Sequence, residues 1–159
     1  MKQEIFPIQD SRRNFLALLG IGGVGLLSSA LFPHRSFATV EETLDAIDKI
    51  TGGKAPTEGK ISIELPKIAE NGNTVPIVVS VESPMTDRDY VKAIHVLAEE
   101  NPNPDVATFH LTPMSGKAWV KGRIRLAKTQ KVVAVAEMSD GAMYIAKQKI
   151  KVTIGGCGG

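Results

Sequence analysis

Alternation of apolar and polar residues at a period of two constrains this chain of 159 residues more than any other feature. Such alternation is typical of strands that bury one face. It recurs at 61–65, 75–82, 90–98, 105–112, 117–126, 130–138 and 141–154, with turn residues such as Asn71-Gly72-Asn73 between the runs. In the clearest run, one face carries Ala118, Val120, Gly122, Ile124 and Leu126, and the other carries Trp119, Lys121, Arg123 and Arg125.

Seven short strands at spacings of about ten residues predict a mainly β fold, an antiparallel β-sandwich of immunoglobulin-like type. In the last run, the face expected to point inward carries Ala142, Tyr144, Ala146, Gln148, Ile150, Val152 and Ile154. Ahead of the strands, apolar residues at helical spacing predict a short helix from Val40 to Ile50, ended by Gly52-Gly53. The expected organisation is a helix and linker over residues 39–57, the sandwich over 58–154 and a tail over 155–159.

The beginning of the chain is typical of an export signal. Arg12-Arg13 precedes an uncharged run from Phe15 to Phe32, and small residues around Ala38 follow. This order predicts a twin-arginine (Tat) signal peptide over residues 1–38 and therefore a periplasmic protein. The alternative is an uncleaved membrane anchor, since the run is just long enough to span a bilayer. Glycines within the run weaken that alternative, so no stable membrane anchor is expected.

The net charge of +2 belongs to this leading segment, because the rest of the chain has 15 basic and 15 acidic residues. Proteins that bind nucleic acid gather basic residues on a face or an arm, so this balance argues against a nucleic-acid partner. A single cysteine excludes a framework of intrachain disulfides. No cluster of cysteines and histidines at ligand spacing indicates a metal site.

The only cysteine lies among glycines at the end of the chain, which reads Gly155, Gly156, Cys157, Gly158, Gly159. Because glycine has no side chain, we expect a thin and flexible tail whose five extended residues reach about 16–18 Å. An unpaired cysteine in an exported protein risks unwanted disulfides, so its exposure indicates a use. We interpret the tail as an arm that brings the thiol into narrow pockets of other proteins.

Several alternatives to this interpretation differ in class. The cysteine could be an accident of a frayed terminus, or it could form an interchain disulfide in a homodimer or in a pure interaction module. A nucleophile of the protein's own active site needs a base within hydrogen-bond reach, which a glycine arm does not supply. A sulfur donor of the ubiquitin-like kind would instead carry a thiocarboxylate on Gly159, and this requires ATP, which the periplasm lacks.

Other candidate residues carry less chemistry. His95 and His110 lie in strand-like segments, where structural or interface histidines are favoured over metal ligands because further ligands are not apparent. Trp119 with Arg123 and Arg125 fits either a docking face or an ordinary solvated strand face.

The ending Val152-Thr153-Ile154-Gly155-Gly156-Cys157-Gly158-Gly159 resembles the terminal motif of the SoxY family of the periplasmic Sox sulfur-oxidation system. The likeness continues through residues 68–72, 91–95, 107–113 and 136–141, and with the leader it spans essentially the whole chain. It implies an immunoglobulin-like carrier that is not an enzyme and has no cofactor. Residue by residue, Cys157 is the attachment point for sulfur, and Gly155, Gly156, Gly158 and Gly159 form its arm.

The resemblance also implies the partners and the chemistry of thiosulfate oxidation. The carrier pairs with SoxZ, and the leader exports both chains. The haem enzyme SoxAX couples thiosulfate to the carrier thiol as an S-thiosulfonate. The manganese hydrolase SoxB then releases sulfate and leaves a persulfide, which the sulfane dehydrogenase SoxCD oxidises where it is present.

Overall fold

The computed structural model describes residues 40–156, all of which belong to one compact unit. The signal peptide predicted for residues 1–38 therefore lies outside the described residues, as do Cys157, Gly158 and Gly159. Between residues 40 and 156, no helix is long and apolar enough to cross a membrane.

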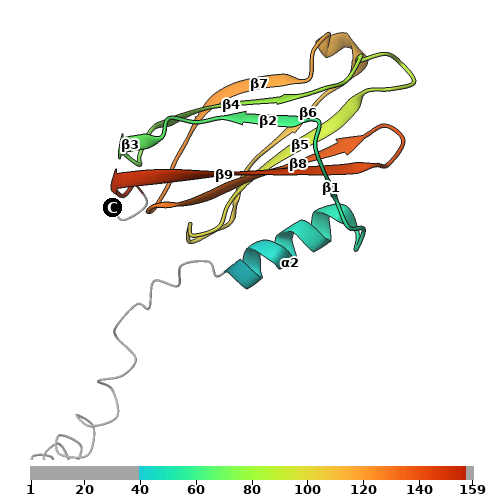
Figure 1. Ribbon diagram of the computed structural model, residues 1–159. Helices are drawn as coiled ribbons and strands as arrows, with labels where there is room; N and C mark the ends of the chain where they lie inside the picture. The colour runs from blue at the N-terminus through green and yellow to red at the C-terminus, as the bar shows by residue number, and fades with distance from the viewer. Residues whose placement is uncertain (1–39, 157–159) are drawn as a thin grey trace, which may run out of the picture. The chain divides into compact units, whose positions relative to one another are not determined.

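Two sheets pack face to face, which confirms the predicted immunoglobulin-like β-sandwich (Figure 1). The larger sheet has the strand order β1-β9-β8-β5-β6, with β3 also paired to β9, and the smaller has the order β2-β4-β7. The elements are α2 (Val40–Thr51), β1 (Thr57–Glu58), β2 (Ile61–Glu64), β3 (Ile68–Asn71), β4 (Val75–Val81), β5 (Val91–Ala98), β6 (Asp105–His110), the 3-10 turn η1 (Pro113–Ser115), β7 (Trp119–Ile124), β8 (Gln130–Met138) and β9 (Met143–Ile154).

The core lies between the sheets and is formed by alternating strand positions, as the period of two predicts. On the β7 segment, Ala118, Ile124 and Leu126 are buried, whereas Trp119 and Lys121 are exposed. Strand β4 follows the same rule and buries Val75, Ile77, Val79 and Val81.

Helix α2 covers the outer face of the larger sheet, and its predicted extent is confirmed to within one residue. Its buried Ile47 packs with Leu97 of β5 and with Val133 and Val135 of β8. Strand β8 is therefore covered on both faces, which explains its nearly continuous buried run in place of alternation.

The structure adds two strands that the periodicity did not predict. Strands β1 and β3 are short, and both pair with β9 in parallel, so the sandwich is mainly but not wholly antiparallel. Neither strand alternates: β1 is exposed throughout, and β3 buries only Ala69. Periodicity in the sequence reflects which side chains are buried. It therefore cannot predict a strand that is held mainly by backbone pairing.

Strand β9 departs from the prediction at Gln148, which is exposed, and at its end. Ile154 was expected to point inward, but it is 65% exposed. Its neighbour across the ladder is the exposed Asn71 of β3 rather than a residue of the core.

Candidate functional site

Strand β9 leads directly to the glycine-rich end of the chain, so the candidate site begins where this strand ends. Its partner changes along its length: β8 pairs with it as far as Ile150, and β3 pairs with it from Lys151 to Ile154. Thr129, the residue before β8, also bonds to both backbone groups of Val152 in β9. The Thr129 Oγ1 accepts a hydrogen bond from the Val152 N–H at 2.9 Å and donates one to its carbonyl at 3.3 Å.

Beyond β9, three backbone segments meet. The Gly72 N–H donates to the Ile154 carbonyl at 2.7 Å, and the Gly72 carbonyl accepts from the Leu126 N–H at 2.8 Å. The Leu126 carbonyl in turn accepts from the Gly156 N–H at 2.9 Å. We call the junction of Gly72, Leu126, Ala127, Gly155 and Gly156 the glycine dock.

The glycine dock has no room for side chains at its three glycines. A Cβ on Gly72 would lie 2.8 Å from the Gly156 nitrogen and would overlap the Leu126 carbonyl oxygen. A Cβ on Gly156 would overlap the backbone of Gly72 and Asn73, and one on Gly155 would overlap the Ala127 carbonyl oxygen. Glycine is required here by close backbone approach, one of the uses that only this residue serves.

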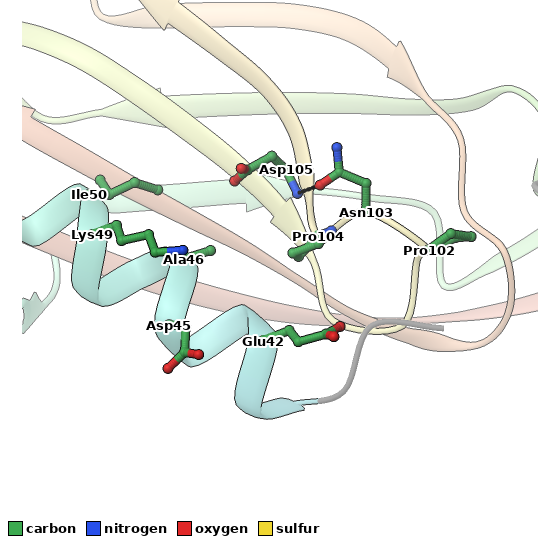
Figure 2. A pocket seen from close by; sticks show the side chains of 9 residues that line it. All are labelled: Glu42, Asp45, Ala46, Lys49, Ile50, Pro102, Asn103, Pro104 and Asp105. Carbon is green, nitrogen blue, oxygen red and sulfur yellow. Dashed lines mark hydrogen bonds between the residues drawn. The ribbon is translucent and has the colours of Figure 1, made fainter. Parts of the chain in front are cut away.

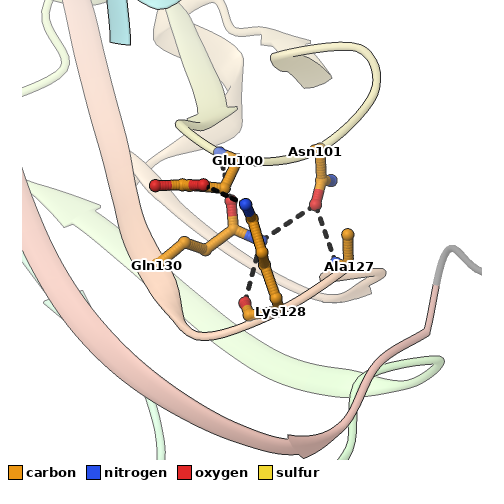
Figure 3. A network of polar contacts seen from close by, with 5 residues as sticks. All are labelled: Glu100, Asn101, Ala127, Lys128 and Gln130. Carbon is orange, nitrogen blue, oxygen red and sulfur yellow. Dashed lines mark hydrogen bonds and ion pairs between the residues drawn. The ribbon is translucent and has the colours of Figure 1, made fainter. Parts of the chain in front are cut away.

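A network of buried amides fixes the Leu126–Ala127 side of the glycine dock (Figure 3). Asn101 donates from Nδ2 to the Arg125 carbonyl at 2.9 Å, and its Oδ1 accepts from the Ala127 N–H and from Gln130 Nε2, both at 2.9 Å. Gln130 Oε1 accepts from the Glu100 N–H at 2.8 Å. Because Asn101 and Gln130 are buried, these bonds replace those that water would make.

The structure thus divides the predicted arm. Gly155 and Gly156 were expected to be part of a flexible extension, but they lie against the sandwich, with Gly156 buried. Cys157, Gly158 and Gly159 follow outside the described residues. Sequence reasoning found the turn at Gly72 but missed its contact with the tail, and it missed Asn101 and Gln130 entirely.

The two histidines share the outer face of the larger sheet without forming a metal site. His95 is half-buried, and its Nδ1 lies 3.0 Å from Thr108 Oγ1. Burial lowers the pKa of His95, with a smaller lowering from His110, while Glu137 and Asp105 raise it. Over the described part of the chain, no group of three or more His, Cys, Asp or Glu residues is placed to hold a metal ion.

Trp119 lies on the solvent face of β7, where it is 50% exposed opposite Ser80 of β4. Arg123 projects from the same face and donates from Nη1 to Thr74 Oγ1 at 3.2 Å. This arrangement fits both interpretations offered for this face.

A shallow groove of about 530 Å³ lies between α2 and the segment that leads into β6 (Figure 2). None of its lining residues is a cysteine or a histidine. The lining residues are Glu42, Asp45, Ala46, Lys49, Ile50, Pro102, Asn103, Pro104 and Asp105.

Comparisons with solved structures support the architecture. Superoxide reductase (neelaredoxin) from Ignicoccus hospitalis is 19% identical, with a TM-score of 0.53, and the match covers 59% of this chain and 80% of that one. A putative superoxide reductase from Thermotoga maritima is 20% identical, with a TM-score of 0.51 and coverage of 62% and 87%. At these identities, the likeness shows a shared fold alone. A search of curated proteins gave no significant match.

Two further comparisons concern the family. The model of "sulfur oxidation protein SoxY" matches residues 47–157. The sulfur carrier protein SoxY from Chlorobium limicola f thiosulfatophilum is 35% identical, with a TM-score of 0.60, and the match covers 73% of this chain and all of that one. Since the family model spans well over half of the sequence and this relative is matched over its entire length, the chain belongs to the SoxY family of sulfur oxidation proteins.

Proposed function

We propose that this protein is a covalent carrier of sulfur in thiosulfate oxidation and that Cys157 is the residue that holds the sulfur. The observation that carries the proposal is the extent of the family match, which ends at residue 157, the only cysteine in the sequence. The related Chlorobium protein is itself described as a sulfur carrier.

The proposed chemistry needs a thiol but no catalytic group on this chain. In the loading step, the Cys157 thiolate and thiosulfate lose two electrons in total to the haem enzyme SoxAX, and a new S–S bond gives Cys–S–S–SO₃⁻. In the second step, SoxB adds water across the terminal S–S bond. Sulfate and a proton leave, and the persulfide Cys–S–SH remains. SoxCD, where present, oxidises that outer sulfur for a further hydrolysis.

The sequence around the cysteine supports a carrier rather than an enzyme. Cys157 has two glycines on each side, and these supply no base to activate a nucleophile of the protein's own. A covalent adduct cannot diffuse away between enzymes, so one thiol can serve several of them in turn. We further propose a heterodimer with SoxZ and export to the periplasm by the twin-arginine route.

Mass spectrometry of the mature protein purified from thiosulfate-grown cells tests the proposal. We expect mass increments of sulfane sulfur and of thiosulfonate on the peptide that contains Cys157. An increment on the Gly159 carboxylate would instead indicate a thiocarboxylate donor. A thiol found only free or in disulfides would indicate a cross-linking module, and either result would refute the carrier.

Cys157→Ser provides the matched control. A hydroxyl cannot form the S–S bond, so every sulfur increment is expected to vanish. The substitution leaves every described core residue unchanged, so the melting temperature is expected to remain that of the wild type.

A further inference from the structure

Backbone hydrogen bonds fix the position of the last described residues before Cys157. Gly156 is buried, and its N–H is bonded to the Leu126 carbonyl. Gly72 bonds on one side to Ile154 and on the other to Leu126, so it joins the end of β9 to the segment that follows β7. Three segments far apart in the sequence thus meet immediately before the cysteine.

Burial of apolar surface does not account for this junction. Glycine has no side chain to bury, so closing the glycine dock removes little apolar area from water. It also costs conformational entropy, of which glycine has the most to lose. What the contact provides is a defined position for the chain at residue 156.

The opposite wall of the glycine dock is rigid for reasons independent of the tail. Asn101 bonds to the backbone on both sides of Leu126, at the Arg125 carbonyl and the Ala127 N–H. Thr129 ties the same loop to Val152 of β9. The carbonyl that receives Gly156 is therefore held from two directions.

We infer that the glycine dock is a positioning device for the carrier thiol, in which Gly72 and Gly156 set the point from which Cys157 is presented to partner enzymes. This inference rests on the proposed carrier function. With the chain docked at Gly156, three residues instead of five follow the point of attachment in the sequence. The expected free reach of about 16–18 Å is thereby reduced. Partner enzymes must accordingly approach the end of the sandwich that carries the Gly72 turn.

Gly72→Ala and Gly156→Ala test the inference. In each variant the added methyl group overlaps backbone on the other side of the same contact, so the glycine dock cannot form. Gly156→Ala is the safer of the two for folding, since the chain can undock beyond β9 without disturbing the sheets. Gly122→Ala on β7 is the control, because a Cβ there would have no atom within 4 Å. All are made in the full chain, exported and purified as the mature protein.

The first measurement is amide hydrogen exchange at position 156 by NMR. In each dock variant we expect its exchange to accelerate by at least about tenfold, because the bond to Leu126 is lost. The core amides of β8 should remain protected, and the Gly122→Ala protein should match the wild type. Unchanged exchange at position 156 in both dock variants would overturn the inference.

The second measurement compares two rates on the same proteins. One is alkylation of Cys157 by iodoacetamide, and the other is sulfate formation from thiosulfate in a periplasmic extract of a host strain that lacks this protein. Undocking should leave alkylation within about twofold and slow sulfate formation by about tenfold or more, since lost orientation affects only reactions inside a structured site. Sulfate formation that is unchanged or faster would overturn the inference.

The double variant Gly72→Ala/Gly156→Ala adds a test of the shared contact. If both changes act by undocking the same residue, the double variant should be no slower than the slower single variant. Multiplied losses would show that the two glycines act separately and would refute a common dock. Failure of the carrier function itself looks different: the wild-type protein would then carry no sulfur on Cys157.

Discussion

His95 is a single residue whose surroundings predict a response to pH. Burial holds the pKa of this imidazole below its ordinary value of 6.5, despite the opposing effect of Glu137. The folded protein therefore binds fewer protons at His95 than the unfolded chain does. The contribution of His95 to the free energy of unfolding is therefore fully present above pH 6.5. It decreases as the pH falls from 6.5 toward the lower pKa of the folded state.

We expect His95→Asn to flatten this part of the pH dependence, since asparagine can still bond to Thr108 Oγ1 but does not titrate. Urea unfolding of wild type and variant at about pH 7.5 and about pH 5 measures the effect. Equal slopes for His95→Asn and wild type would contradict the assignment.

At the scale of elements, the loop between β7 and β8 depends on the buried amide of Asn101. Replacing it by alanine leaves the buried Gln130 Nε2 and the Ala127 N–H without this acceptor, so Asn101→Ala is expected to lower the free energy of unfolding by about 1–3 kcal/mol. Denaturant melts measure this change. Asn103→Ala is the matched control, because Asn103 is exposed and its Oδ1 accepts a hydrogen bond within its own turn, from the Asp105 N–H. A loss as large in the control would show that the network adds nothing.

The tail after the glycine dock supports a different prediction. Gly158→Val adds a β-branched side chain next in sequence to the proposed carrier thiol and leaves the five residues of the glycine dock unchanged. It should slow thiosulfate turnover by the partner enzymes while alkylation by a small reagent stays close to the wild-type rate. Parallel losses in both rates would mean that the glycine tunes the thiol's reactivity instead of its access. Gly156→Val is unsuitable for this purpose because it would also break the dock.

At the scale of the whole molecule, export should depend on the leading arginines. Replacing Arg12 and Arg13 by lysine keeps the charge but removes the proposed twin-arginine motif, so unprocessed protein should accumulate in the cytoplasm. Immunoblots of cytoplasmic and periplasmic fractions measure this. Lys2→Arg is a control of similar chemistry outside the motif. Undiminished mature protein in the periplasm would refute the route.

We also expect the protein to be one subunit of a heterodimer. If the proposed signal peptide serves a partner without one of its own, the mature protein should co-purify from periplasm with a second small β-protein, the proposed SoxZ. Sedimentation of the native extract measures the mass of the complex. A stable monomer under these conditions would end the heterodimer proposal.

Much of the sandwich could be predicted because its determinants are local. Alternation over a few residues reports which face of a strand is buried, so the inward and outward faces of β7 were predicted residue by residue. The same rule missed β3, which buries only Ala69, and it misplaced Ile154, whose surroundings depend on which strand lies beside it. Helix α2 could be placed along the chain, but the sheet face that it covers could not.

The sequence by itself determined seven of the strands, the short helix, the family resemblance and the candidate cysteine, because each depends on residues that are neighbours in the chain. Only the tertiary structure decided that Gly155 and Gly156 belong to the sandwich rather than to the arm. The sequence presents Gly72 as a turn residue and Gly156 as part of a flexible end, and nothing local links them. Their contact arises because the packing of two sheets brings residues 72, 126 and 156 together, and only there does the absence of a side chain become a requirement.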